Sequence, residues 1–136
     1  MNLQTALFAF FLYGFLGWCL DSFERSLETR RWTPGGFSRL PFTPIYGFGA
    51  LLVFTVWPWI VAWPLLFQFV FFALGLGAFE YGSGYYCERV FGRRLWDYST
   101  NQFNFAGRTD LFHLIAWGTL ALLLVYFIHP LFFGST

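Results

Sequence analysis

Long apolar segments alternate with short polar ones along the chain, and this pattern predicts four helices. Residues 3–20 and 111–128 are each predominantly apolar, and about 18 residues of helix extend about 27 Å, close to the thickness of a bilayer's hydrocarbon core. Residues 44–86 are long enough for two more spans, because Trp-Pro pairs at Pro58 and Pro64 divide them. We therefore expect helices at about 3–27, 44–61, 64–91 and 110–129, the last ended by His129-Pro130.

The composition places these helices in a lipid bilayer. Hydrophobic residues make up 57% of the 136 positions and charged residues only 11%, whereas about a quarter of an ordinary soluble domain is charged. A core of this length cannot enclose so many apolar side chains, so many of them must face lipid. We predict an all-α polytopic membrane protein, with residues 1–136 forming a single transmembrane domain.

The basic residues predict the orientation in the membrane. All eight are arginines, and they fall in two groups that follow the first and third predicted helices, namely Arg25, Arg30, Arg31 and Arg39, and Arg89, Arg93, Arg94 and Arg108. With four spans, both groups lie on one side, which the positive-inside rule makes cytoplasmic. We expect a multi-pass protein of a bacterial inner or plasma membrane, with both termini outside. Because the chain has no lysine for a phosphate-binding loop, any ATPase must be a separate subunit.

The two halves of the chain share a pattern. The first and third helices each end with a glycine, a carboxylate and a pair of arginines, and a glycine-containing loop and a returning helix follow. Two parallel-repeat helical hairpins with polar cytoplasmic loops would give this pattern. Shared helix-end chemistry without duplication is the alternative.

Helical spacing brings carboxylates onto glycine-rich faces. Gly77, Glu80, Gly84 and Cys87 share one face of the third helix, as Gly14, Gly17, Asp21 and Glu24 do on the first. Because glycines allow close helix packing, we expect these faces to point into the bundle. Glu80 lies at membrane depth near the cytoplasmic boundary, where an ionisable group marks a pathway or a site with a partner, and we expect that partner to be an arginine. A purely structural Glu–Arg pair is the alternative.

Two helix starts on the cytoplasmic side resemble anion sites. Thr43-Pro44 and Thr109-Asp110 each read as N-cap and first helical residue, and arginines are close in sequence. The expected anion-binding residues are Arg93, Arg94, Arg108 and Thr43; the alternative is that the arginines only set the topology. The two histidines, His113 and His129, should lie on opposite sides of the membrane, so we expect no metal site and no cofactor. Nucleic-acid binding is also not expected, because acidic residues balance the arginines.

Several motifs resemble the CmpB-type family of type IV ABC-transporter permeases. They are GWCLD at 17–21, GGFSRLPFTPIYGFGA at 35–50, FEY at 79–81, LWDYS at 95–99 and FNFAGR at 103–108. The order and spacing match from about residue 8 to Pro130. Where the family has Glu this chain has Asp21, and where the family has Asn-Arg it has Gly35-Gly36. The resemblance implies a small integral membrane protein with a role in transport.

Three functions are compatible with these features. The first is a transporter or permease component with a polar cytoplasmic-facing site, whose expected residues are Asp21, Tyr46, Glu80, Asp97, Asn104 and Arg108. A second is a membrane enzyme acting on a lipid or lipid-linked substrate, with Asp97 and Glu80 as acid and base. The third is a structural or regulatory membrane subunit. The expected partners are membrane lipids, further copies in a homo-oligomer and the separate ATPase subunit.

One question about the loop at residues 93–110 follows from its composition. It carries more polar groups than a connection between two helices needs. Either it folds back over Glu80 as a lid, or it lies on the surface.

Overall fold

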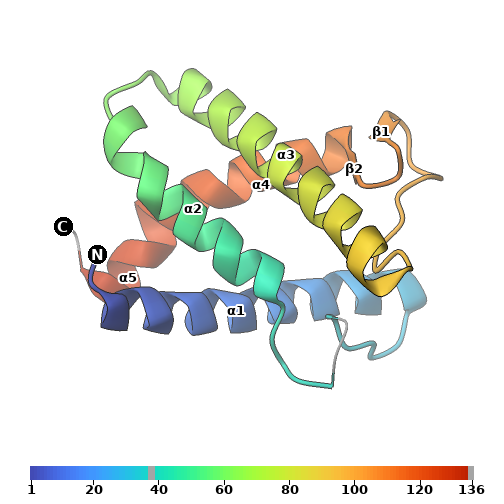
Figure 1. The fold of residues 1–136 in the computed structure, drawn as a ribbon. Helices are drawn as coiled ribbons and strands as arrows, with labels where there is room; N and C mark the ends of the chain where they lie inside the picture. Colours follow the sequence, from blue (N-terminus) through green and yellow to red (C-terminus); the bar gives the residue numbers. More distant parts are fainter. Residues whose placement is uncertain (37–38, 135–136) are drawn as a thin grey trace. The chain divides into compact units, whose positions relative to one another are not determined.

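A computed structural model describes residues 1–36 and 39–134 and is mainly helical (Figure 1). The elements in chain order are α1 (Leu3–Thr29), α2 (Pro44–Ile60), α3 (Leu65–Phe91), β1 (Asn104–Phe105), β2 (Thr109–Asp110), α4 (Leu111–Leu123), the π-helical turn η1 (Leu124–Ile128) and α5 (His129–Phe133). Within the described residues, three helical segments are long and apolar enough to cross a membrane: Leu3–Thr29, Leu65–Phe91 and Leu111–Phe133. The helix α2 is apolar but shorter. The predicted helical pattern is therefore confirmed, while insertion into a membrane stays a prediction.

The chain divides into two compact units, Met1–Leu52 and Val53–Thr136, which are described separately. In the first unit, the Asn2 side chain caps α1 by accepting a hydrogen bond from the Thr5 amide at 2.8 Å. The chain after α1 runs back along that helix, where the amide of Gly36 donates to Asp21 Oδ2 at 2.8 Å. The beginning of α2 packs closely on α1, because at Gly17 a Cβ atom would overlap the Tyr46 ring. The glycine-rich face of α1 thus permits this contact, as expected.

The second unit contains the later part of α2 and everything that follows it. Its core forms where α3 packs against α4, and a Cβ atom at Gly77 would overlap the Leu114 side chain. At the other end of α3, the buried Gln68 amide donates to the Trp63 carbonyl at 2.9 Å, and its oxygen accepts from the Tyr126 hydroxyl at 2.9 Å. These hydrogen bonds hold the turn between α2 and α3 against η1.

The last helix does not end at His129-Pro130 as expected. The amide of His129 bonds to the Leu124 carbonyl, five residues back, and a new helix begins with Pro130 in its first turn and continues to Phe133. A proline is compatible with a first turn, because its missing N–H would have no intrahelical partner there. The wider π turn therefore lets the helix continue past the proline.

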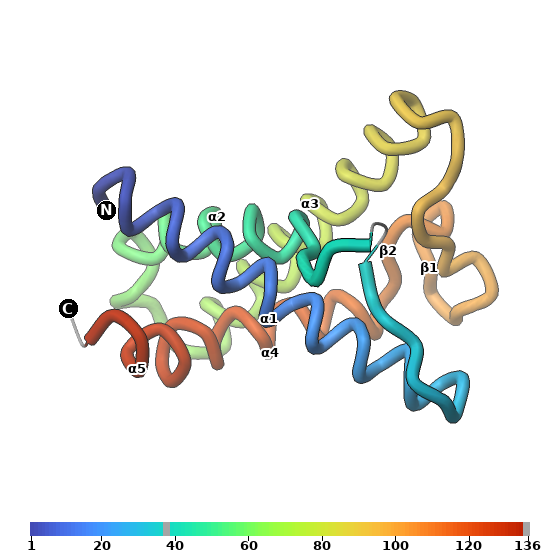
Figure 2. The backbone as a smooth tube through the Cα atoms, turned by 90° about the horizontal axis from the view of Figure 1, so that it is seen from below, coloured from blue at the N-terminus to red at the C-terminus, as the bar shows by residue number. Residues whose placement is uncertain are grey.

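A short antiparallel ladder, which the sequence did not predict, precedes α4. It pairs Asn104 with Asp110 and Phe105 with Thr109. Figures 1 and 2 both show this ladder and the rest of the segment between α3 and α4 gathered at one end of these two helices. That segment contains most of the polar residues on which the functional predictions depend.

Candidate functional site

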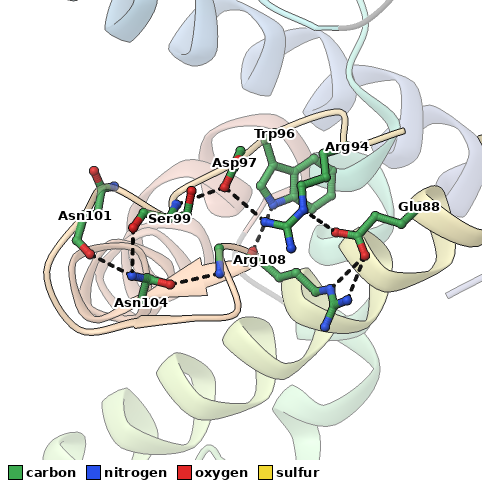
Figure 3. Close-up of polar contacts among 9 residues, drawn as sticks. Glu88, Arg94, Trp96, Asp97, Ser99, Asn101, Asn104 and Arg108 are labelled. Carbon is green, nitrogen blue, oxygen red and sulfur yellow. Dashed lines mark hydrogen bonds and ion pairs between the residues drawn. The ribbon is translucent and has the colours of Figure 1, made fainter. Parts of the chain in front are cut away.

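The loop between α3 and α4 holds its own shape through its polar residues (Figure 3). The Tyr98 amide donates to the Gly107 carbonyl at 2.8 Å, and the Trp96 indole donates to the Arg108 carbonyl at 2.9 Å. The Asn104 side chain bridges the turn. Its Nδ2 atom donates to the backbone carbonyl of Asn101 at 2.9 Å, and its Oδ1 atom accepts from the backbone amide of Gly107 at 2.9 Å. Asn104, a predicted site residue, therefore shapes the loop.

A network of charges attaches this loop to the end of α3. Arg108 Nη2 lies 2.7 Å from Glu88 Oε2. Arg94 bridges two carboxylates, because its Nε atom lies 2.9 Å from Glu88 Oε1 and its Nη1 atom lies 3.0 Å from Asp97 Oδ1. The Arg108 guanidinium also lies over the Tyr81 ring, 5.0 Å from its centroid. Glu88 joins both arginines and was not among the predicted site residues, although helical spacing puts it on the same face as Tyr81.

The charges of this network compensate one another. The pKa of Asp97 is lowered, first by hydrogen bonds from Ser99 and then by Arg94. The pKa of Arg108 is raised, chiefly by its hydrogen bonds to Glu88. An anion would have to compete with these carboxylates, while Arg93 is exposed and forms no ion pair with any described residue. Anion binding at Arg93, Arg94, Arg108 and Thr43 therefore stays a prediction.

Asp110 joins the loop to the start of α4. Its fully buried carboxylate caps α4 by accepting from the His113 amide at 2.7 Å, so Asp110 is the N-cap and the assignment of Thr109 was wrong by one residue. Its Oδ2 atom also accepts from the side-chain amide of Asn101 at 2.7 Å, and its Oδ1 atom lies 2.7 Å from His113 Nδ1. The Tyr98 ring stacks on the His113 ring with centroids 4.0 Å apart.

The balance of effects on Asp110 favours its charged form. Burial alone would raise the pKa of this carboxyl, but the hydrogen bonds from Asn101 and His113 outweigh that effect, and the pKa is lowered. A buried carboxylate needs such donors, because its charge has lost most of its hydration.

Glu80 lies in a different setting on the same helix as Glu88. Gly77, Glu80 and Gly84 are buried, as expected for their shared face, and Glu80 is only 4% exposed. Its Oε1 atom makes no hydrogen bond to any described residue. The Thr109 hydroxyl and the Trp117 indole nevertheless lie close enough to act on its carboxyl as hydrogen-bond donors, and the charges of His113 and Asp110 also act on it.

The expectation that an arginine pairs with Glu80 was wrong. Arg108 instead binds Glu88, about two helical turns closer to the end of α3. The fold of the loop favours this choice, because the Trp96 indole donates to the Arg108 carbonyl and both side chains lie against Gly84, about one turn before Glu88.

An open groove of about 610 Å³ runs between α3, the ladder and the start of α4, and Glu80 is not among its lining residues. Its walls are apolar and aromatic, and its polar lining residue Thr109 is only 4% exposed. The Thr109 hydroxyl makes no hydrogen bond to any described residue. The groove is therefore apolar, and the Thr109 hydroxyl is directed to the buried carboxyl of Glu80.

The remaining predicted site residues belong to the first unit. Asp21 accepts from the Gly36 amide and pairs with Arg25 at 3.3 Å, and Tyr46 packs on Gly17. Thr43 directly precedes α2, but its buried hydroxyl makes no hydrogen bond to a described residue, so it does not cap that helix through its side chain. A single site that combines these residues with Glu80, Asp97, Asn104 and Arg108 stays a prediction.

Comparisons with known proteins identify the family. A search of curated proteins and a search of solved structures found no match to this chain. The family model described as "Putative ABC-transporter type IV" matches residues 8–135, which is nearly the whole chain, so this protein belongs to that family.

Proposed function

We propose that this protein is a component of a membrane transporter and that Glu80 is the proton-binding group of its transport site. The family description names transport, and the apolar helices support a membrane location. The observation that carries the proposal is the buried carboxyl of Glu80, whose Oε1 atom lacks a hydrogen bond within the described part of the chain.

The energetic cost of such a carboxyl supports a functional role. An ionised group at membrane depth is unfavourable by several kcal/mol (about 2.5–3.5 on insertion scales) unless a partner compensates it. Glu88, on the same helix, pairs with two arginines, whereas Glu80 forms no ion pair with an arginine in the described part of the chain. Glu80 is therefore suited to alternate between a protonated form and a form that binds a cation.

His113 offers a proton route between Glu80 and the loop. Its ring interacts electrostatically with Glu80, and its Nδ1 atom lies 2.7 Å from Asp110. An imidazole accepts a proton at one nitrogen and releases it from the other. In this proposal, His113 passes protons between Glu80 and the polar loop, which faces the cytoplasm.

Further subunits complete the transporter in this proposal. Leu65, Leu66 and Phe67 at the start of α3 are 59–69% exposed, which suits lipid or neighbouring copies of the chain. Because the chain contains no lysine, nucleotide-driven transport would require a separate ATPase subunit.

Reconstitution with a pH-sensitive dye tests the proposal. The full chain is placed in phosphatidylcholine liposomes that enclose the dye, and cationic, anionic and neutral solutes are added outside in turn. We expect at least one class of solute to drive proton movement in the wild type. Glu80→Gln should abolish it, because an amide cannot release a proton, whereas Glu80→Asp should retain part of it.

The matched control is Glu28→Gln, the same chemical change at an exposed position near the end of α1. It should leave proton movement unchanged. Wild-type rates in the Glu80→Gln variant, with size exclusion showing that it is folded, would refute the role of Glu80.

A further inference from the structure

The groove lies on a face of α3 that continues to the end of that helix. The α3 residues Leu74, Ala78 and Tyr81 line the groove. Tyr85 and Arg89 follow Tyr81 at intervals of four residues, so helical geometry places all five on one side of α3. All five are exposed. This face therefore changes from apolar to aromatic to basic toward the polar loop.

The basic end of this face has a positive charge that no described carboxylate balances. Tyr85 brings two guanidiniums together, because those of Arg89 and Arg108 each lie 5.2 Å from its ring centroid. Arg108 is held by Glu88 (Figure 3). Arg89 instead donates to the Tyr85 hydroxyl at 3.1 Å and forms no ion pair with any described residue. Arg89 therefore has N–H donors left for an anion, and the planar fork of a guanidinium matches a phosphate group.

The length of this face matches one leaflet of a bilayer. If α3 enters the hydrocarbon core at Leu65, its first residue, a core about 30 Å thick is crossed in about 20 residues, near Tyr85. Leu74 then lies near the midplane, and Arg89 lies about 6 Å beyond Tyr85, among the lipid headgroups. Tyrosine is typical of that boundary. The apolar part of the face is therefore at the depth of acyl chains, and its basic end is at the depth of lipid phosphates.

We propose that this face of α3 binds one anionic phospholipid, with the lipid phosphate at Arg89 and one acyl chain in the groove. Phe105 of the ladder and Leu114 of α4 line the groove together with α3, so the chain contacts several elements of the protein at once. An anionic lipid is favoured over a zwitterionic one, because a zwitterionic headgroup brings its own cation, which Arg89 repels. The inference does not depend on the transport role or on Glu80, which does not line the groove.

Native mass spectrometry of the full chain, purified in detergent and titrated with lipid, tests the site. The probe is palmitoyl-oleoyl phosphatidylglycerol, and phosphatidylcholine with the same chains is the zwitterionic comparison. The wild type should bind one molecule of phosphatidylglycerol more tightly than phosphatidylcholine. Arg89→Gln should weaken phosphatidylglycerol binding at least about fivefold, the factor expected for one arginine at a lipid surface, and leave phosphatidylcholine binding unchanged.

The matched control is Arg31→Gln, the same loss of charge at an exposed arginine that follows α1. It should bind phosphatidylglycerol as the wild type does. An equal loss of affinity in both variants would show attraction to the overall charge of the protein, and would overturn the site.

Ala78→Phe tests the apolar part of the site. The new ring fills the groove, so affinity for palmitoyl-oleoyl phosphatidylglycerol should fall at least about fivefold. Dihexanoyl phosphatidylglycerol should bind equally to this variant and to the wild type, because its short chains do not extend over the roughly 16 Å of helix from Arg89 to Ala78. The control is Gly75→Phe, an exposed position outside the lining where an added Cβ meets no atom within 4 Å. It should bind the long-chain lipid as the wild type does.

Size exclusion checks that each variant is folded. Equal affinity of the wild type for the two long-chain lipids, or unchanged phosphatidylglycerol affinity in Arg89→Gln, overturns the inference. Unchanged long-chain affinity in Ala78→Phe, or displacement of the lipid by inorganic phosphate, would show that the headgroup alone is held, and would also overturn it.

Discussion

Asp110 offers a sharp test of how the polar loop contributes to stability. Its carboxylate is fully buried and accepts hydrogen bonds from the backbone of α4 and from Asn101, with the His113 ring 2.7 Å away. In Asp110→Ala, loss of the helix cap costs about 1 kcal/mol. The donors left buried without an acceptor add about 1–3 kcal/mol. We therefore expect the free energy of unfolding to fall by about 2–4 kcal/mol.

The measurement is reversible unfolding of the full chain in mixed micelles as the mole fraction of dodecyl sulfate is raised, followed by tryptophan fluorescence. The matched control is Asp97→Ala, the same change in the same loop. Asp97 is exposed, so water replaces its partners and the loss should be clearly smaller. An Asp110→Ala protein within about 0.5 kcal/mol of the wild type would contradict the assigned role of this carboxylate.

Two further predictions concern pH and packing. Because the pKa of Asp110 is lowered by folding, its contribution to stability is complete above the unfolded value of about 4 and is lost as the pH falls through the lower folded value. Unfolding measured between about pH 6 and pH 3 should show this loss in the wild type and a shallower one in Asp110→Asn. Gly77→Ala should lower the free energy of unfolding by about 1–3 kcal/mol, because the new Cβ overlaps Leu114. Gly75→Ala, where the Cβ meets nothing within 4 Å, should raise it by about 0.5–1 kcal/mol. Equal effects of the two alanines would mean that helix propensity, and not packing on α4, determines both.

Simple patterns were sufficient to predict the helices and the packed face of α3. Apolar length, with the proline at 64 and the polar continuation of each helix, predicted α1 and α3 to within about two residues at either end. The spacing of Gly77, Glu80 and Gly84 predicted their burial, because helical geometry fixes which residues share a face.

The partners of the polar residues were not predictable in this way. Whether Arg108 meets Glu80 or Glu88 depends on the path of the loop, in which Phe103 and Ala106 have positive φ angles of 54°. Residues other than glycine rarely adopt that conformation, and no sequence rule locates it here. The same loop geometry makes Asp110, and not Thr109, the cap of α4.

Whether the loop covers Glu80 as a lid depends on where its polar side chains bond. Most polar side chains in the middle of the loop bond to the loop itself or to the end of α3, as Asp97, Asn104 and Arg108 do. Thr109 and Asp110, at the end of the loop, are the groups of that segment that act most strongly on Glu80. The loop therefore brings one hydroxyl and one carboxylate close to the buried glutamate.

The π-helical turn η1 resets the phase of the last helix. The bond from the His129 amide to the Leu124 carbonyl accommodates one residue more than an α-helical turn would. All later residues are therefore rotated by about 100° relative to a continuous α-helix. In this phase, the His129 ring lies 4.1 Å from that of Phe54 and 4.4 Å from that of Phe133, measured between centroids. A chain one residue shorter in this turn would present another side chain to Phe54, so the residue count of the turn, as much as its composition, determines which side chain contacts Phe54.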